Sequence, residues 1–123
     1  MKWEDAKMCI ALDRLDLLRR SPDVLKNYEE YRQNLVANGI NIRDVILKKM
    51  RKRPVKWMKN DYPYNVEGTK HYLIWSMTPL DINLIRDFAD KYTGGREYLT
   101  FVNPEHLKSI PDIWHTHVLV RMS

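Results

Sequence analysis

The stretch Lys70-His71-Tyr72-Leu73-Ile74-Trp75 ends in four consecutive aromatic or aliphatic residues and follows a turn-rich sequence, Asn60 to Asn65 and then Gly68. A short run of this kind, bounded by turn-forming residues, is typical of a β-strand. Two similar runs follow, at Glu97 to Val102 and at His115 to Arg121. The sequence therefore predicts a small antiparallel sheet in its C-terminal half.

One helix is expected between the first two of these strands. Thr78-Pro79-Leu80-Asp81 combines a capping residue, a proline and an acid, which together predict a helix start with Thr78 as the cap. Gly94-Gly95 is expected to end the helix. Its apolar face is formed by five residues, Ile82, Leu84, Ile85, Phe88 and Ala89.

The N-terminal part is predicted to be helical. Trp3 to Leu18 indicates one helix or two short ones. Ser21-Pro22-Asp23 predicts a second start, with an end at Gly39, and Asn41 predicts a third helix that Pro54 stops. The second helix is expected to bury a stripe that contains Leu25, Tyr28, Leu35 and Val36. The predicted fold class is α+β, a single domain over 1–123 with a helical part (1–53) followed by a sheet with one packed helix (54–123).

Composition excludes several classes of protein. The chain has 123 residues, of which 44% are hydrophobic and 30% charged, as expected for one soluble domain. No apolar stretch approaches the ~20 residues that a membrane-spanning helix requires. Cys9 is the only cysteine, so no intramolecular disulfide can form. We therefore expect an intracellular protein, cytoplasmic or nuclear.

The net charge of +5 comes from one segment. The range 48–59, called the basic segment below, has seven of the 21 basic residues and no acid: Lys48, Lys49, Arg51, Lys52, Arg53, Lys56 and Lys59. Such a cluster can attract nucleic acid or another polyanion, and Trp57 within it is compatible with stacking on a base. A solvated connector between two elements explains it equally well.

Three of the four histidines, His106, His115 and His117, fall within twelve residues. On a strand, His115 and His117 share one face and lie about 6.5 to 7 Å apart. The pair can act in phosphoryl chemistry with one imidazole as nucleophile. It can instead hold a metal, with a third ligand among His106, Glu105 and Asp112. The remaining alternative is a structural role for both.

Several blocks closely resemble the N-acetylglucosamine-induced protein family, a mostly fungal domain-of-unknown-function family. They are Ala11 to Pro22, Asn60-Asp61-Tyr62-Pro63-Tyr64, His71 to Ser76 and Trp114 to Arg121, in matching order along nearly the whole chain. That family's name records a transcriptional response and implies no biochemical activity.

The C-terminal half also resembles a divergent histidine-triad (HIT) domain, the fold of nucleotide phosphoramidases and nucleotidyl transferases. Asp61 and Pro63 before His71, and Asn103 followed by a loop and His115-Thr116-His117, are similar to that family in order and spacing. The resemblance implies that His115 is the nucleophile and His117 the last histidine of the motif, and Ile113 stands at the place of the first.

These resemblances imply a HIT-like protein that binds a nucleotide or another phosphorylated small molecule, with catalytic His115 and His117 and no metal or other cofactor. Its activity is nucleotidyl hydrolysis or transfer through His115, or binding alone if the site is degenerate. Proteins of this kind often form homodimers through the sheet. The alternatives are a non-enzymatic module that binds nucleic acid through the basic segment and a metal site at the two histidines. Expected ligand contacts are Asp61, His71, Asn103, Lys108 and Ser109.

Overall fold

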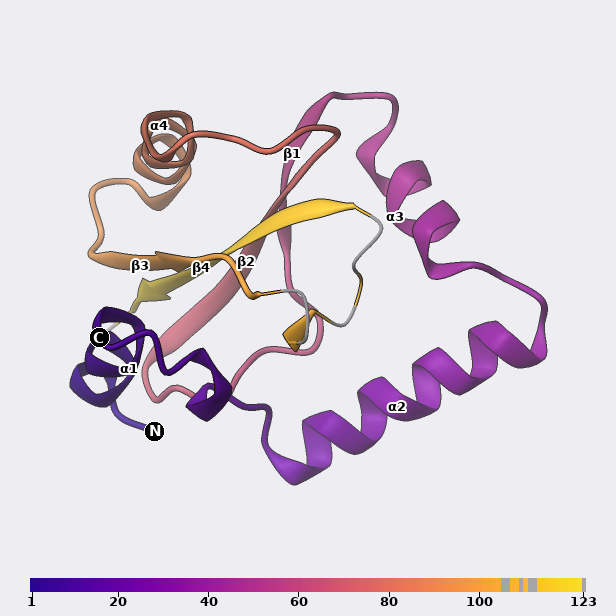
Figure 1. The fold of residues 1–123 in the computed structure, drawn as a ribbon, viewed down its shortest axis with the longest axis horizontal. Helices are drawn as coiled ribbons and strands as arrows, with labels where there is room; N and C mark the ends of the chain where they lie inside the picture. Colours follow the sequence, from indigo (N-terminus) through magenta and orange to yellow (C-terminus); the bar gives the residue numbers. More distant parts are fainter. Residues whose placement is uncertain (105–106, 109, 111–112, 123) are drawn as a thin grey trace.

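The computed structural model describes residues 1–104, 107–108, 110 and 113–122. These residues form an antiparallel four-stranded sheet with helices on both faces, so the α+β prediction is confirmed (Figure 1). The strands are β1 (Val55–Lys59), β2 (Thr69–Ser76), β3 (Tyr98–Phe101) and β4 (Trp114–Arg121), in the spatial order β1-β2-β4-β3. The two central strands, β2 and β4, therefore pair directly, with Trp75 opposite His115 and Leu73 opposite His117.

The N-terminal part is helical, as predicted, and Trp3 to Leu18 forms two short elements. They are α1 (Trp3–Ala11) and a 3-10 turn, η1 (Leu15–Leu17). The next helices are α2 (Pro22–Ala37) and α3 (Ile42–Met50). Their predicted caps are confirmed: the Ser21 hydroxyl accepts from the Val24 N–H at 3.4 Å, and the Asn41 side chain accepts from the Arg43 N–H at 2.9 Å.

Helix α4 (Ile82–Thr93) connects β2 to β3 and packs on one face of the sheet. Its predicted start is wrong, because Asp81 rather than Thr78 is the cap. The Asp81 carboxylate accepts from the Leu84 N–H at 3.0 Å, and the helix therefore begins at Ile82. Its C-terminal cap, Gly94, has a φ of 63°, the left-handed conformation that glycine adopts without strain.

Alternation along β2 and β4 gives the sheet two different faces. The α4 face, defined by the contact of Ile74, Val118 and Val120 with Ile85 and Ala89, is apolar. The opposite face, called the histidine face below, carries His71, His115 and His117. There α1 and η1 pack beside Leu119, and α3 packs beside Leu73 and Trp75.

The buried stripe predicted for α2 is wrong. The helix has no buried residue, Val36 is 78% exposed, and Leu25 is also exposed. Figure 1 shows α2 as an outer element, joined through a turn to α3. Its half-buried side chains lie one helical turn apart and include Tyr28 and Tyr31, which contact Tyr62. No helix in the described part of the chain is long and apolar enough to cross a membrane.

Candidate functional site

The side chain of His115 is held in one tautomer. Its Nδ1 lies 2.9 Å from the Ile113 carbonyl oxygen, and because a carbonyl can only accept, Nδ1 must carry the proton. Burial lowers the pKa of His115, and the charge of Lys108 lowers it further, against the opposing effect of the Ile113 carbonyl. The imidazole is therefore neutral at pH 7, with the lone pair on Nε2. Nε2 has no hydrogen-bond partner among the described residues.

His71 and His117 form a buried hydrogen-bonded pair, with His71 Nε2 2.8 Å from His117 Nδ1. The Tyr64 backbone N–H donates to His71 Nδ1 at 3.1 Å, so this nitrogen is an acceptor and Nε2 carries the proton. The Asn60 side-chain oxygen accepts from the Tyr62 N–H, so its amide nitrogen faces His71. This nitrogen lies 3.3 Å from His71 Nδ1 and donates to it. His71 Nε2 thus donates to His117 Nδ1, and His117 carries its own proton on Nε2.

Both histidines of this pair are neutral at physiological pH. Burial lowers the pKa of His71 to about 3, with smaller contributions from the charges of Arg20 and His115. Burial also lowers the pKa of His117 well below its usual value, again with His71, His115 and Arg20 nearby. Protonating either ring would place a positive charge in a cluster that is shielded from water and lies near Arg20. Both effects disfavour the charged form and therefore lower both pKa values.

Asn103 closes this network on the side of β3. Its side-chain nitrogen lies 3.0 Å from the Tyr64 hydroxyl and 3.3 Å from His117 Nε2, while its buried oxygen has no partner among the described residues. Since His117 Nε2 carries a proton, two donors would face each other in this arrangement. Turning the amide by half a rotation lets the oxygen accept from both His117 and Tyr64. Both ring nitrogens of His117 are then engaged within the protein.

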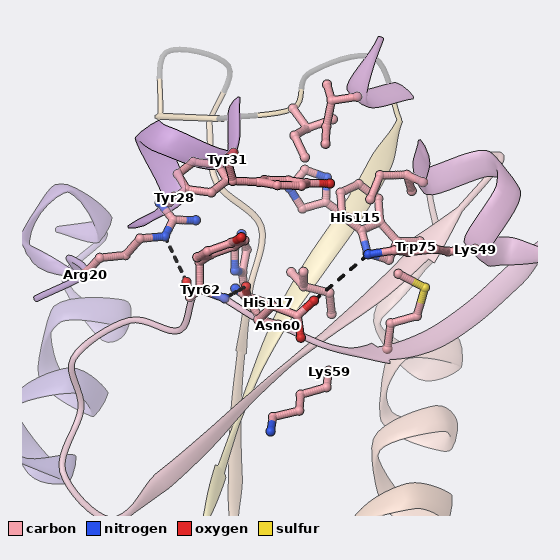
Figure 2. A pocket seen from close by; sticks show the side chains of 16 residues that line it. Arg20, Tyr28, Tyr31, Lys49, Lys59, Asn60, Tyr62, Trp75, His115 and His117 are labelled. Carbon is pink, nitrogen blue, oxygen red and sulfur yellow. Dashed lines mark hydrogen bonds and ion pairs between the residues drawn. The ribbon is translucent and has the colours of Figure 1, made fainter. Parts of the chain in front are cut away.

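A pocket of about 120 Å³ lies beside His115 on the histidine face (Figure 2). Its walls come from the segment before α2, from α2 and α3, from β1 and the turn after it, and from β2 and β4. In Figure 2, Arg20 and Tyr28 lie on one side of the pocket and Lys49 lies on the other, beside Trp75 and His115. The His115 ring packs on Trp75 with a centroid separation of 4.3 Å.

Among the described residues, three cations and one acid line the pocket. The cations are Arg20, Lys49 and Lys59, and the acid is Asp61, whose carboxylate lies 4.0 Å from Lys49 Nζ. Arg20 is fixed in place: its Nε donates to the Tyr62 carbonyl at 2.8 Å, and its guanidinium lies 4.2 Å from the centre of the Tyr28 ring. An excess of positive charge beside a neutral imidazole favours an anionic ligand.

The structure brings some of the predicted site residues together and separates others. His115, His117 and Asp61 line the pocket, as do Lys49 and Lys59 of the basic segment. His71 and Asn103 lie behind His117, and Asn103 borders a separate hollow beside Leu18. Lys108 is half-buried and close enough to shift the pKa of His115. Ser109 lies outside the described residues.

The cations of the basic segment come from three elements, and four of them line one groove: Lys49, Arg51, Lys56 and Lys59. Lys48 and Lys49 end α3, three cations follow in the turn, and Lys56 and Lys59 lie on β1. Trp57 is not available to stack on a base, because its ring already stacks on Tyr72 and Tyr92 at centroid distances of 4.9 and 5.1 Å. Strand β1 was not predicted as a separate element, because residues 55–59 were treated as part of the basic segment.

Sequence reasoning also missed three residues of the pocket, Arg20, Tyr28 and Tyr31. Tyr28 was assigned to a buried stripe, with Tyr31 or Arg32 as a further member, because helical spacing does not distinguish a core from a pocket wall. The available signal for Arg20 was its position in Arg19-Arg20-Ser21-Pro22, one of the blocks that carry the family resemblance.

The proposed third metal ligands, His106, Glu105 and Asp112, lie outside the described residues. Among the residues that the structure does describe, no group of three histidine, cysteine or acidic side chains has a geometry that could hold a metal ion. The described residues therefore give no geometric support for a metal site at His115 and His117.

The chain belongs to a protein family of unknown function, DUF3605, whose sequence pattern matches residues 2–93. This confirms the expected membership of a domain-of-unknown-function family. The N-acetylglucosamine-induced and HIT-like identifications find no counterpart in the comparisons and stay predictions. No curated protein matches the sequence. A solved chain described as the crystal structure of HTC1 is similar in fold, with a TM-score of 0.79 and 23% identity, covering 99% of this chain and 85% of that one.

Proposed function

We propose that this member of the DUF3605 family binds a phosphorylated small molecule of nucleotide type and transfers or hydrolyses its nucleotidyl group through His115. The observation that carries the proposal is the tautomer of His115. Its Nδ1–H is held by the Ile113 carbonyl, which leaves the Nε2 lone pair without a partner among the described residues in a pocket lined by Arg20, Lys49 and Lys59. A neutral imidazole with one anchored nitrogen is suited to attack phosphorus.

The reaction proceeds in two displacements. His115 Nε2 forms a bond to the α-phosphorus while the bond to the leaving group breaks, and the leaving group departs with that electron pair and takes a proton from solvent. The imidazole then has substituents on both nitrogens and is positively charged, and the Ile113 carbonyl stabilises it through Nδ1–H. Water next attacks phosphorus, the electron pair of the P–N bond returns to Nε2, and the proton of the water goes to solvent.

The cations of the pocket stabilise charge on the phosphoryl oxygens during both steps. Arg20 is the best oriented of them, because Tyr62 and Tyr28 fix its guanidinium before a ligand arrives. A pocket volume of about 120 Å³ fits a phosphoryl group with part of a sugar, since pockets for drug-sized ligands have roughly 300 Å³ or more. The rest of the ligand extends beyond this pocket.

His117 has a positioning role in this proposal. Both of its ring nitrogens are engaged, by His71 and by Asn103, and its ring lies 5.4 Å from that of His115, centre to centre. It therefore forms a rigid, uncharged wall behind the nucleophile rather than a second acid or base.

The alternative, nucleic-acid binding by the basic segment in a non-enzymatic module, has weaker support. The seven cations are divided among a helix, a turn and a strand, and Trp57 stacks within the protein. A single-stranded site normally combines a basic groove with exposed aromatic rings.

A covalent-labelling experiment tests the proposal. The protein is incubated with adenosine 5′-phosphoramidate and with ATP, without divalent cations, and quenched rapidly for mass spectrometry. We expect an acid-labile adenylyl group on His115, its loss in His115→Ala, and no effect of EDTA. The matched control is His71→Gln, which removes a buried histidine that does not line the pocket and should keep the label. Turnover that survives in His115→Ala, or that EDTA removes, would contradict the proposal.

A further inference from the structure

A second, shallower groove adjoins the pocket at the end of α3. Its cavity volume is about 350 Å³, and its lining residues are Lys49, Arg51, Lys56, Met58, Lys59 and Asp61. Four of these six also line the pocket beside His115. The two hollows are therefore adjacent, because the same four side chains border both.

The backbone of this groove is strained at two consecutive cations. Arg51 has φ 51° and ψ 45°, and Lys52 has φ 63°, so both lie in the left-handed region. This position after a helix is usually occupied by glycine, because the Cβ of any other residue lies too close to the backbone in the left-handed conformation. Glycine would relieve this strain, yet the chain has Arg51 and Lys52 here. Their presence points to a role for the two side chains.

The groove also concentrates like charges. The Lys56 ammonium donates to the Lys49 carbonyl oxygen at 2.7 Å, which holds it against the C-terminal end of α3 together with Arg51. Among the described lining residues Asp61 is the only acid, and its one ion pair to these four cations is with Lys49. The mutual repulsion of these cations is relieved when a multiply charged anion binds between them.

We propose that this groove binds the further phosphates of a ligand whose reacting phosphoryl group occupies the pocket at His115, so that the preferred ligand carries a diphosphate or triphosphate. The inference rests on the proposed function for the placement of the reacting group. It also accounts for the small volume of the pocket, because the polyphosphate lies in the open groove.

The test compares the binding of AMP, ATP and inorganic tripolyphosphate by calorimetry without divalent cations, in the wild type and in Arg51→Gly. Glycine relieves the strain, so the variant should melt at least as high as the wild type, and lost binding cannot be attributed to unfolding. We expect ATP and tripolyphosphate to bind about tenfold more weakly to the variant, the loss of one charge-assisted contact, and AMP to change less than twofold. Lys91→Gln on α4, across the sheet, is the matched control for charge and should change neither.

The outcomes separate the two claims. Equal binding of AMP and ATP to the wild type, or full ATP binding by Arg51→Gly, would overturn the groove while leaving the pocket at His115 intact. Binding of tripolyphosphate that depends on Arg51, without any binding of AMP, would support the groove and contradict the proposed function. A single-stranded hexanucleotide that binds more tightly than ATP and loses its binding in Arg51→Gly would overturn the inference in favour of nucleic acid.

Discussion

The two faces of the β2–β4 strand pair consist of alternate residues of the same eight-residue strands, and they differ in chemistry. On the α4 face, Ile74 and Val118 are fully buried against apolar side chains, and the Thr116 hydroxyl donates to the Phe101 carbonyl at 3.1 Å. On the histidine face, three neutral imidazoles lie among apolar side chains such as Leu73 and Leu119, and His115 and His117 border the pocket. The comparison teaches that one pair of strands supports stability on one side and chemistry on the other, so substitutions should separate the two.

The largest expected effect is on the α4 face. Ile74→Ala should lower the free energy of unfolding by about 2 to 5 kcal/mol, because a fully buried side chain leaves a cavity. Ligand affinity of the folded variant should not change. The matched variant is Leu73→Ala. Leu73 precedes Ile74 on β2 and its side chain lines the pocket, so this substitution should reduce both stability and ligand affinity. Denaturant unfolding and calorimetry measure the two quantities. Weaker ligand binding in Ile74→Ala than in Leu73→Ala would break the distinction between the faces.

The histidine face should make stability depend on pH. The pKa of His71 is about 3 in the folded protein, against 6.5 for the unfolded group, so the unfolded state binds more protons between these values. Stability should therefore fall as the pH is lowered from 6.5 towards 3, by up to about 1.4 kcal/mol per pH unit for this histidine. His117 acts in the same direction. His71→Gln should reduce the slope in urea-unfolding series at several pH values, and an unchanged slope would mean that His71 is not held neutral.

The smallest effect is expected at the outer surface of α2. Val36 is 78% exposed, so Val36→Ala should change the free energy of unfolding by less than about 0.5 kcal/mol. The measurement is made at two protein concentrations. A loss above 1 kcal/mol that varies with concentration would indicate that a second copy covers this surface.

Local signals predicted much of the fold. The caps Ser21 and Asn41 and the terminating Gly94 act through hydrogen bonds and φ values within a few residues, and the sequence is sufficient to find them. Thr78 failed as a cap because the backbone is still extended at Asp81, with φ −76° and ψ 166°, so the first helical turn begins only at Ile82. The prediction of a buried stripe on α2 was wrong because the spacing of apolar residues does not specify what the helix packs against.

The site was predictable only in part for the same reason. The period of two on β4 is local, and it placed His115 and His117 on one face. The partnership of His71 with His117 depends on the β2–β4 register, and the approach of Arg20 to Tyr62 joins residues 42 positions apart. Such contacts arise from the tertiary fold, and no spacing in the sequence specifies them.

The central claim, that His115 presents an unprotonated Nε2 to the pocket, is tested most directly by ¹⁵N NMR of the histidine rings at pH 7. We expect the Nδ1–H tautomer for His115 and the Nε2–H tautomer for His71 and His117, and we expect AMP to shift the Nε2 resonance of His115 and to leave that of His71 in place. A protonated Nε2 on His115, or an AMP response confined to the other two rings, would contradict this claim.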